Sequence, residues 1–115
     1  MAGRCWTALR TAGEFAEVRA HGERGATGPL TTWVSHRPGP SRAGMSVPHR
    51  PFGHVARNTV RRRIRAALDE LLPCEGVDVV IALRGAGVPS YDHIRGALST
   101  VLGQGTSGGR AEATG

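Results

Sequence analysis

The clearest pattern in this 115-residue chain is a helical repeat of apolar residues near its middle. The repeating positions, at spacings of four, four and three, are Val60, Ile64, Leu68 and Leu71. Residues at these spacings lie on one face of an α-helix. Gly53 can free the entry into the helix, and Pro73 stops it. The pattern therefore predicts a helix from residue 54 or 55 to residue 72.

A shorter helical pattern lies nearer the N-terminus. Residues 11–14, Thr-Ala-Gly-Glu, fit a capping box, and Phe15 and Val18 then share one helical face. His21 and Gly22 end this helix. The glycines of residues 23–29 indicate a loop or a poor edge strand.

Three other segments have the pattern of β-strands. Residues 30–36 alternate, with Leu30 and Trp33 on opposite faces, and residues 42–47 alternate in the same way. The turn sequence Pro-Gly-Pro-Ser separates them, so we expect these two strands to pair as an antiparallel hairpin. Residues 77–83 are almost continuously apolar, which predicts a strand buried on both faces at the centre of the sheet.

The C-terminal third contains one more helix. Ser90 can cap it, and its apolar face consists of Ile94, Ala97, Leu98 and Val101. Residues 1–8 have no clear period and are expected to be a flexible arm, and residues 103–115 are expected to be a disordered glycine-rich tail. The domain of residues 9–102 is then α+β, a two-layer α-β sandwich whose small mixed sheet has helices packed on one face and a second face available.

Charge is concentrated in one stretch. Residues 42–65 hold seven arginines and no acidic residue, whereas the rest of the chain holds eight basic and nine acidic residues. Arg57, Arg61 and Arg65 form a stripe on the central helix, near its positively charged N-terminal end. Arginines at this spacing repel one another and the positive end of the helix. A folded sequence usually tolerates such repulsion at a functional site, and bound phosphates would relieve it. A solvated charged face is the structural alternative. Nucleic acid is favoured over a membrane, because the apolar face of this helix lacks Trp and Phe.

Cysteine usage and hydropathy suggest the compartment. Cys5 and Cys74 have neither zinc-site nor CxxC spacing, so we expect unpaired thiols in a reducing cytoplasm. No apolar run has the length of a signal peptide or a membrane span, which favours a cytoplasmic protein without a membrane partner. Carboxylates such as Asp78 look isolated, so no protein nuclease site is expected.

The central helix also carries a family signature. Arg57-Asn58-x-x-Arg61-Arg62-x-x-Arg65, with Met45-Ser46-Val47 upstream and the apolar strand downstream, resembles the protein subunit of bacterial ribonuclease P. The resemblance runs from about Leu9 to Leu102. It implies a left-handed β-α-β crossover through the arginine helix, and a subunit that assists a catalytic RNA in removing the 5′ leader of precursor tRNA. The RNA subunit would carry the chemistry and hold most of the Mg²⁺.

The resemblance also implies roles for individual residues. The expected RNA-binding residues, including two from the basic stretch upstream, are Arg57, Asn58, Arg61, Arg62, Arg65, Arg50 and Arg42. The expected leader-binding residues are Phe15, Arg19 and Trp33, where aromatic rings could stack on unpaired bases. Thr59 departs from the family pattern, which usually has another arginine there, and Arg19 replaces an aromatic residue. The expected partners are ribonuclease P RNA and precursor tRNA, and no protein partner is evident.

Alternatives remain open from the sequence. Asn58 could cap the helix rather than contact RNA, and Phe15 could be a core residue. The chain could be a structural, ribosomal-type RNA-binding protein without a role in cleavage. A helix-turn-helix regulator of DNA is less consistent with the sequence, because the segment before the central helix is strand-like and broken by prolines.

Overall fold

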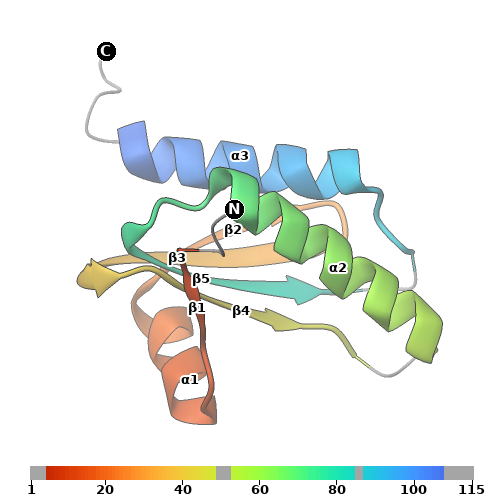
Figure 1. Cartoon of the computed structure of the whole chain (residues 1–115), viewed down its shortest axis with the longest axis horizontal. Helices are drawn as coiled ribbons and strands as arrows, with labels where there is room; N and C mark the ends of the chain where they lie inside the picture. The colour runs from red at the N-terminus through yellow and green to blue at the C-terminus, as the bar shows by residue number, and fades with distance from the viewer. Residues whose placement is uncertain (1–4, 49–52, 85–86, 108–115) are drawn as a thin grey trace.

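The fold is an α+β arrangement of one mixed sheet and three helices, seen here in a computed structural model (Figure 1). The structure describes residues 5–48, 53–84 and 87–107, with side chains described as far as residue 102. The sheet order is β1-β4-β5-β3-β2. In chain order the elements are β1 (Thr7–Ala8), α1 (Ala12–His21), β2 (Glu23–Thr27), β3 (Leu30–Pro40), β4 (Arg42–Ser46), α2 (His54–Leu71), β5 (Glu75–Leu83) and α3 (Tyr91–Ser107).

The central position of β5 is confirmed, but the predicted hairpin is wrong. Strands β3 and β4 do not pair with each other; β5 lies between them, antiparallel to β3 and parallel to β4. An apolar strand gains most by burying both faces, so β5 takes the middle place although it follows the other strands in sequence. The parallel pair β4 and β5 is joined through α2, as the family resemblance implies. Residues 23–29 were expected to form a loop or a poor edge strand. Their first five residues form the edge strand β2, which pairs with β3.

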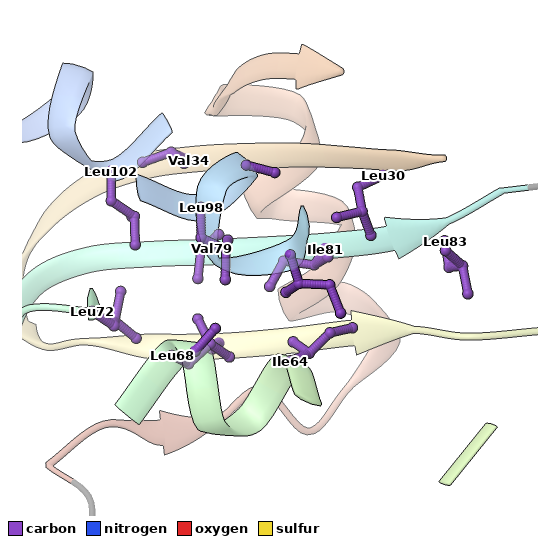
Figure 2. Packing of buried hydrophobic residues seen from close by; sticks show 14 of the residues in the cluster. Leu30, Val34, Ile64, Leu68, Leu72, Val79, Ile81, Leu83, Leu98 and Leu102 are labelled. Atoms are coloured by element: carbon purple, nitrogen blue, oxygen red, sulfur yellow. The ribbon is translucent and has the colours of Figure 1, made fainter. Parts of the chain in front are cut away.

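The helices divide between the two faces of the sheet. Figure 1 shows α2 and α3 on one side and α1 on the other. The main core lies under α2 and α3, where Ile64 and Leu98 meet Val79 and Ile81 of β5 (Figure 2). Val80, which points the opposite way, packs in a smaller cluster against α1. The fold class is confirmed, but α1 covers part of the face that was expected to be available.

The helix boundaries agree closely with the sequence patterns. Thr11 and Glu14 form the predicted capping box at the start of α1. Helix α2 begins after Gly53 and ends at Leu71, one residue before the predicted end. Ser90 Oγ accepts a hydrogen bond from the backbone N–H of His93 at 3.1 Å, which caps α3 as predicted.

Both ends of the described chain are more ordered than expected. Residues 7–8 pair with β4, and the preceding Trp6 is only 5% exposed, so this part of the predicted arm belongs to the core. At the other end, α3 continues to Ser107 and includes the first part of the predicted tail. The rest of the tail, residues 108–115, lies outside the described residues.

The two cysteines are not free thiols. Cys5 and Cys74 form a disulfide, with their Cα atoms 5.2 Å apart and a sequence separation of 69. The prediction of unpaired thiols was therefore wrong. That prediction used only the spacing of the cysteines along the chain. The bond forms because β1 pairs with the sheet edge and so brings Cys5 beside the connection from α2 to β5.

Candidate nucleic-acid interface

The arginines of α2 fall into two groups. Two of them donate hydrogen bonds to backbone carbonyls, and three have no protein partner among the described residues. Arg57 Nε donates to the backbone carbonyl of Val47 at 3.2 Å, and Arg63 Nη1 donates to the carbonyl of Pro89 at 2.7 Å. Among the residues that the structure describes, no carboxylate forms an ion pair with Arg61, Arg62 or Arg65, and no hydrogen bond joins their side chains to the protein. These three guanidinium groups therefore remain available to an anion.

The acidic residues of α2 are occupied elsewhere. The indole Nε1 of Trp6 donates to Asp69 Oδ1 at 2.9 Å. Glu70 accepts hydrogen bonds from Arg95 Nη2 at 2.7 Å and from the Tyr91 hydroxyl at 2.8 Å. Hydrogen bonds from Arg95 and Tyr91 lower the pKa of Glu70 to about 2. Both carboxylates thus join α2 to its neighbours and leave the arginine stripe uncompensated.

A pocket of about 250 Å³ lies beside two of these arginines. We call it the arginine pocket, and its lining residues are Trp6, Ala8, Leu9, Phe15, Ala43, Gly44, Met45, Arg61 and Arg65. It forms because β1 has only two residues, so the edge of β4 is left open beyond them. Helices α1 and α2 approach this open edge from opposite faces of the sheet. The pocket therefore combines apolar and cationic walls.

A second pocket of about 400 Å³ continues from the first along α1. We call it the α1 pocket, and its lining residues are Arg10, Thr11, Ala12, Phe15, Ala16, Arg19, Met45 and Ser46. The two pockets share Phe15 and Met45, so they are adjacent. Together they form a path from the arginine stripe of α2 to the charged side of α1.

Phe15 is both a core residue and a pocket residue. It is half-buried and packs against Leu9, Val18 and Val80, yet it lines both pockets. Its ring lies directly over Gly44, where an added Cβ would be 2.5 Å from the ring Cζ atom. Only glycine leaves this space in the strand. The core alternative for Phe15 is therefore partly confirmed, and its role in binding the leader stays a prediction.

Trp33 and Arg19 meet as a pair. The Arg19 guanidinium lies 5.0 Å from the centroid of the half-buried Trp33 ring, a cation–π contact. Trp33 lines neither the arginine pocket nor the α1 pocket, whereas Arg19 lines the α1 pocket. A nucleotide base that stacked on this face of Trp33 would compete with Arg19.

Arg42 does not join the arginines of α2. Its side chain donates to both oxygens of Asp78, from Nη2 at 2.7 Å and from Nε at 3.2 Å, and to Glu14 Oε2 at 3.3 Å. Arg37 Nε also donates to Asp78 at 2.7 Å. Asp78 is only 2% exposed, so these contacts neutralise a buried charge. The structure gives Arg42 a structural role, and Asp78, which stands apart from other carboxylates in the sequence, is paired with two arginines.

The remaining predicted residues have simple positions. Asn58 is exposed in the second turn of α2, where its Nδ2 lies 3.3 Å from His54 Nε2. Since Gly53 is the N-cap, Asn58 does not cap the helix. Arg50 lies outside the described residues.

Sequence reasoning missed several residues of the interface. Trp6 and Leu9 form part of the arginine pocket, but their segment has no readable period. Gly44 carried a usable signal, because a glycine inside a strand often marks a close approach by another group.

The described residues include no group of three or more His, Cys, Asp or Glu side chains that could hold a metal ion. No helix in the described part of the chain has the length and apolar character needed to cross a membrane.

Comparison with known proteins identifies the family. The family model described as Ribonuclease P matches residues 6–105. This chain belongs to the bacterial ribonuclease P protein family. The "Ribonuclease P protein component" of Acidothermus cellulolyticus is 33% identical over 103 residues, which cover 84% of this chain and 85% of that protein. The chain is thus the protein subunit of ribonuclease P in tRNA 5′ processing, and ribonuclease P RNA is its partner.

Solved structures of the family share the fold. The RNase P protein of Staphylococcus aureus aligns with a TM-score of 0.71 at 19% identity, covering 85% of this chain and 94% of that one. The RNase P protein of Thermotoga maritima aligns with a TM-score of 0.67, also at 19% identity, covering 88% of this chain and 96% of that one. The expected ribonuclease P protein-like fold is therefore confirmed.

Proposed function

We propose that the α2 arginines bind phosphates of ribonuclease P RNA, and that the path through the two pockets takes the single-stranded 5′ leader of precursor tRNA. The supporting observation is that Arg61, Arg62 and Arg65 have no carboxylate partner among the described residues, while two of them line the arginine pocket. Neighbouring cations without carboxylate partners favour a polyanion, since phosphates relieve their repulsion and binding releases counterions from the nucleic acid.

Asn58 complements these arginines in the proposal. Its exposed amide can donate to a phosphate or a 2′-hydroxyl and can also accept a hydrogen bond, which a guanidinium cannot do. Arg57 is partly engaged by the carbonyl of Val47, so we expect it to orient the start of α2 as well as to contact RNA. Arg42 no longer belongs in this set.

Along the path through the two pockets, the leader would meet one aromatic ring and several arginine side chains. The part of Phe15 that lines both pockets can stack on a base, and Arg10 and Arg19 can contact the backbone. Arg24 of β2 pairs across the sheet with Trp33, so its side chain shares that face and can extend the path toward the sheet edge. Stacking and phosphate contacts carry little sequence information, so we expect weak leader-sequence preference.

The chemistry is assigned to the RNA subunit in this proposal. Asp78 is occupied by two arginines, which argues against a role for this carboxylate in cleavage. Mg²⁺ would be held mainly by RNA phosphates, and binding of the protein would order that RNA. We place the assembly in the cytoplasm.

The salt dependence of RNA binding tests the arginine assignment. Each of the variants Arg61→Ala and Arg65→Ala should reduce the slope of log K against log salt by roughly 0.7 to 0.9, the value for one lost phosphate contact. Arg95→Ala is the matched control. It removes the same charge, but Arg95 lies on α3 and already pairs with Glu70 of α2. Equal slopes for all three variants and the wild type would place the RNA elsewhere.

The role in cleavage is tested with precursor tRNA and a bacterial ribonuclease P RNA at low Mg²⁺. Addition of the protein should strongly stimulate cleavage of a substrate with a leader. A structural RNA-binding protein would instead bind RNA tightly without stimulation. That result would contradict the proposed assistance while leaving RNA binding intact.

A further inference from the structure

We propose that Cys5 and Cys74 form a thiol–disulfide exchange site that controls whether β1 stays docked beside the RNA-binding arginines. This inference rests on the proposed function for its effect on RNA, but the docking of β1 can be measured without RNA. The class of co-reactant is a low-molecular-weight thiol and its disulfide.

The disulfide joins two segments that meet only in the folded chain. Cys5 directly precedes the buried Trp6, and Cys74 lies in the connection from α2 to β5. Both cysteine residues are exposed, so a small thiol can reach the bond. Ser41 holds the two segments together: its backbone N–H donates to the Cys74 carbonyl at 3.0 Å, and its carbonyl accepts from the Thr7 N–H at 3.0 Å.

Without the disulfide, β1 depends on a short pairing with the sheet edge and on the burial of its neighbours. The strand has two residues, paired with Arg42 and Ala43 of β4, and the backbone hydrogen bonds from Thr7 to Ser41 and from Leu9 to Ala43 flank this pairing. Trp6 and Leu9 are buried, and the Trp6 indole donates to Asp69. Ordering residues 5–9 costs conformational entropy comparable to what burial of two side chains supplies. The covalent link therefore shifts a nearly balanced equilibrium toward the docked state.

The docked segment is one wall of the arginine pocket. Trp6, Ala8 and Leu9 line it together with Arg61 and Arg65. Undocking would remove that wall, loosen the support of Phe15 by Leu9 and uncover the edge of β4. The oxidised protein thus presents a preformed pocket, and the reduced protein presents it only while β1 is docked.

The exchange itself is a balanced two-step reaction. A thiolate attacks one sulfur of the Cys5–Cys74 bond, the S–S bond breaks, and a mixed disulfide and a cysteine thiolate form. A second thiol molecule attacks the mixed disulfide and releases the other cysteine. Two small thiols are oxidised to one small disulfide, and the protein disulfide gains two electrons and two protons. The same small disulfide reverses the reaction.

The first measurement follows the position of Trp6 without RNA. The chain has two tryptophans, so a Trp33→Phe background leaves Trp6 as the single fluorophore. In oxidised glutathione its emission should be that of a buried indole. In dithiothreitol the emission should shift to the red and become accessible to acrylamide. The same comparison in a background that also has Cys5→Ser and Cys74→Ser should show no response to dithiothreitol.

The second measurement uses the chain with Trp33 intact, bound to ribonuclease P RNA. If reduction leaves β1 docked in about half to a tenth of the molecules, the apparent affinity should fall about two- to tenfold, in proportion to the competent fraction. The Cys5→Ser, Cys74→Ser double variant should bind like the reduced protein under both conditions.

The outcomes separate this inference from the proposed function. RNA binding by the oxidised protein together with unchanged Trp6 emission and unchanged affinity on reduction overturns the exchange site alone. Alkylation of both thiols after equilibration with oxidised glutathione overturns it as well, because no disulfide would have formed. A redox response of Trp6 without RNA binding in either state supports the docking switch and overturns the proposed function.

Discussion

Replacement of Asp78 by Asn tests the ion-pair cluster that ties the centre of the sheet together. The substitution keeps the shape of the side chain but removes the charge that faces Arg37 and Arg42. Breaking a buried ion pair costs about 3 to 5 kcal/mol. The arginine side chains are 34% and 23% exposed, so solvent screens part of this loss and the low end applies. We expect the free energy of unfolding to fall by about 3 kcal/mol, which lowers Tm by about 12 °C.

The loss should depend on pH in a defined direction. Burial alone would raise the pKa of Asp78, but hydrogen bonds from Arg42 and Arg37 outweigh it and hold the pKa below its usual value. Because the folded pKa lies below the unfolded one, this stabilisation is present above about pH 4 and is lost as pH falls through the folded pKa. The Asp78→Asn variant has no such component. The stability difference between the two proteins should therefore shrink as the medium becomes more acidic.

Urea unfolding at a series of pH values from 7 downward measures both effects. Asp92→Asn is the matched control, since Asp92 is exposed in the first turn of α3 and should change stability by only tenths of a kcal/mol. A loss below about 1 kcal/mol at pH 7 for Asp78→Asn, or a difference from wild type that stays constant with pH, would refute the ion-pair account.

Three further variants should change the free energy of unfolding, measured by urea or thermal unfolding. Gly44→Ala places a Cβ 2.5 Å from Phe15 Cζ and should cost about 1 to 3 kcal/mol, whereas Gly96→Ala on α3 meets no atom within 4 Å and should stabilise by about 0.5 to 1 kcal/mol. Equal effects of the two alanines would contradict the close approach of Phe15. Removing the disulfide by Cys5→Ser and Cys74→Ser opens a loop of 69 residues and should cost about 4 kcal/mol against the oxidised wild type. The reduced wild type should match the double variant, and a difference between them would show that the loss comes from the serines.

The local patterns of the sequence were sufficient for most helices. The capping box of Thr11 and Glu14, the apolar stripe of α2 and the Ser90 cap all depend on residues within a few positions of one another. The apolar run of β5 likewise predicted its central place. Such features follow from the chain's own periodicity, so no tertiary information is needed to predict them.

The sequence also identified the arginine helix and its family. Charge without nearby acid, on a helix with an ordinary core face, pointed to a polyanion. It could not show which arginines are available. Arg42 lies within the same basic stretch as Arg61, yet Arg42 meets Asp78, 36 residues away, while Arg61 meets no carboxylate in the described chain.

Tertiary structure alone decided the pairings between distant segments. The hairpin expected of β3 and β4 was replaced by insertion of β5, because the burial of both faces of one strand outweighs the pairing of neighbours. Cys5 and Cys74 were judged by their spacing, and their bond exists because β1 returns to the edge of β4. The sequence by itself thus determined which elements form and where positive charge collects. The three-dimensional arrangement determined which cations are neutralised and how the pocket beside the remaining ones is closed, since ion pairs, disulfides and pockets depend on distances in space rather than along the chain.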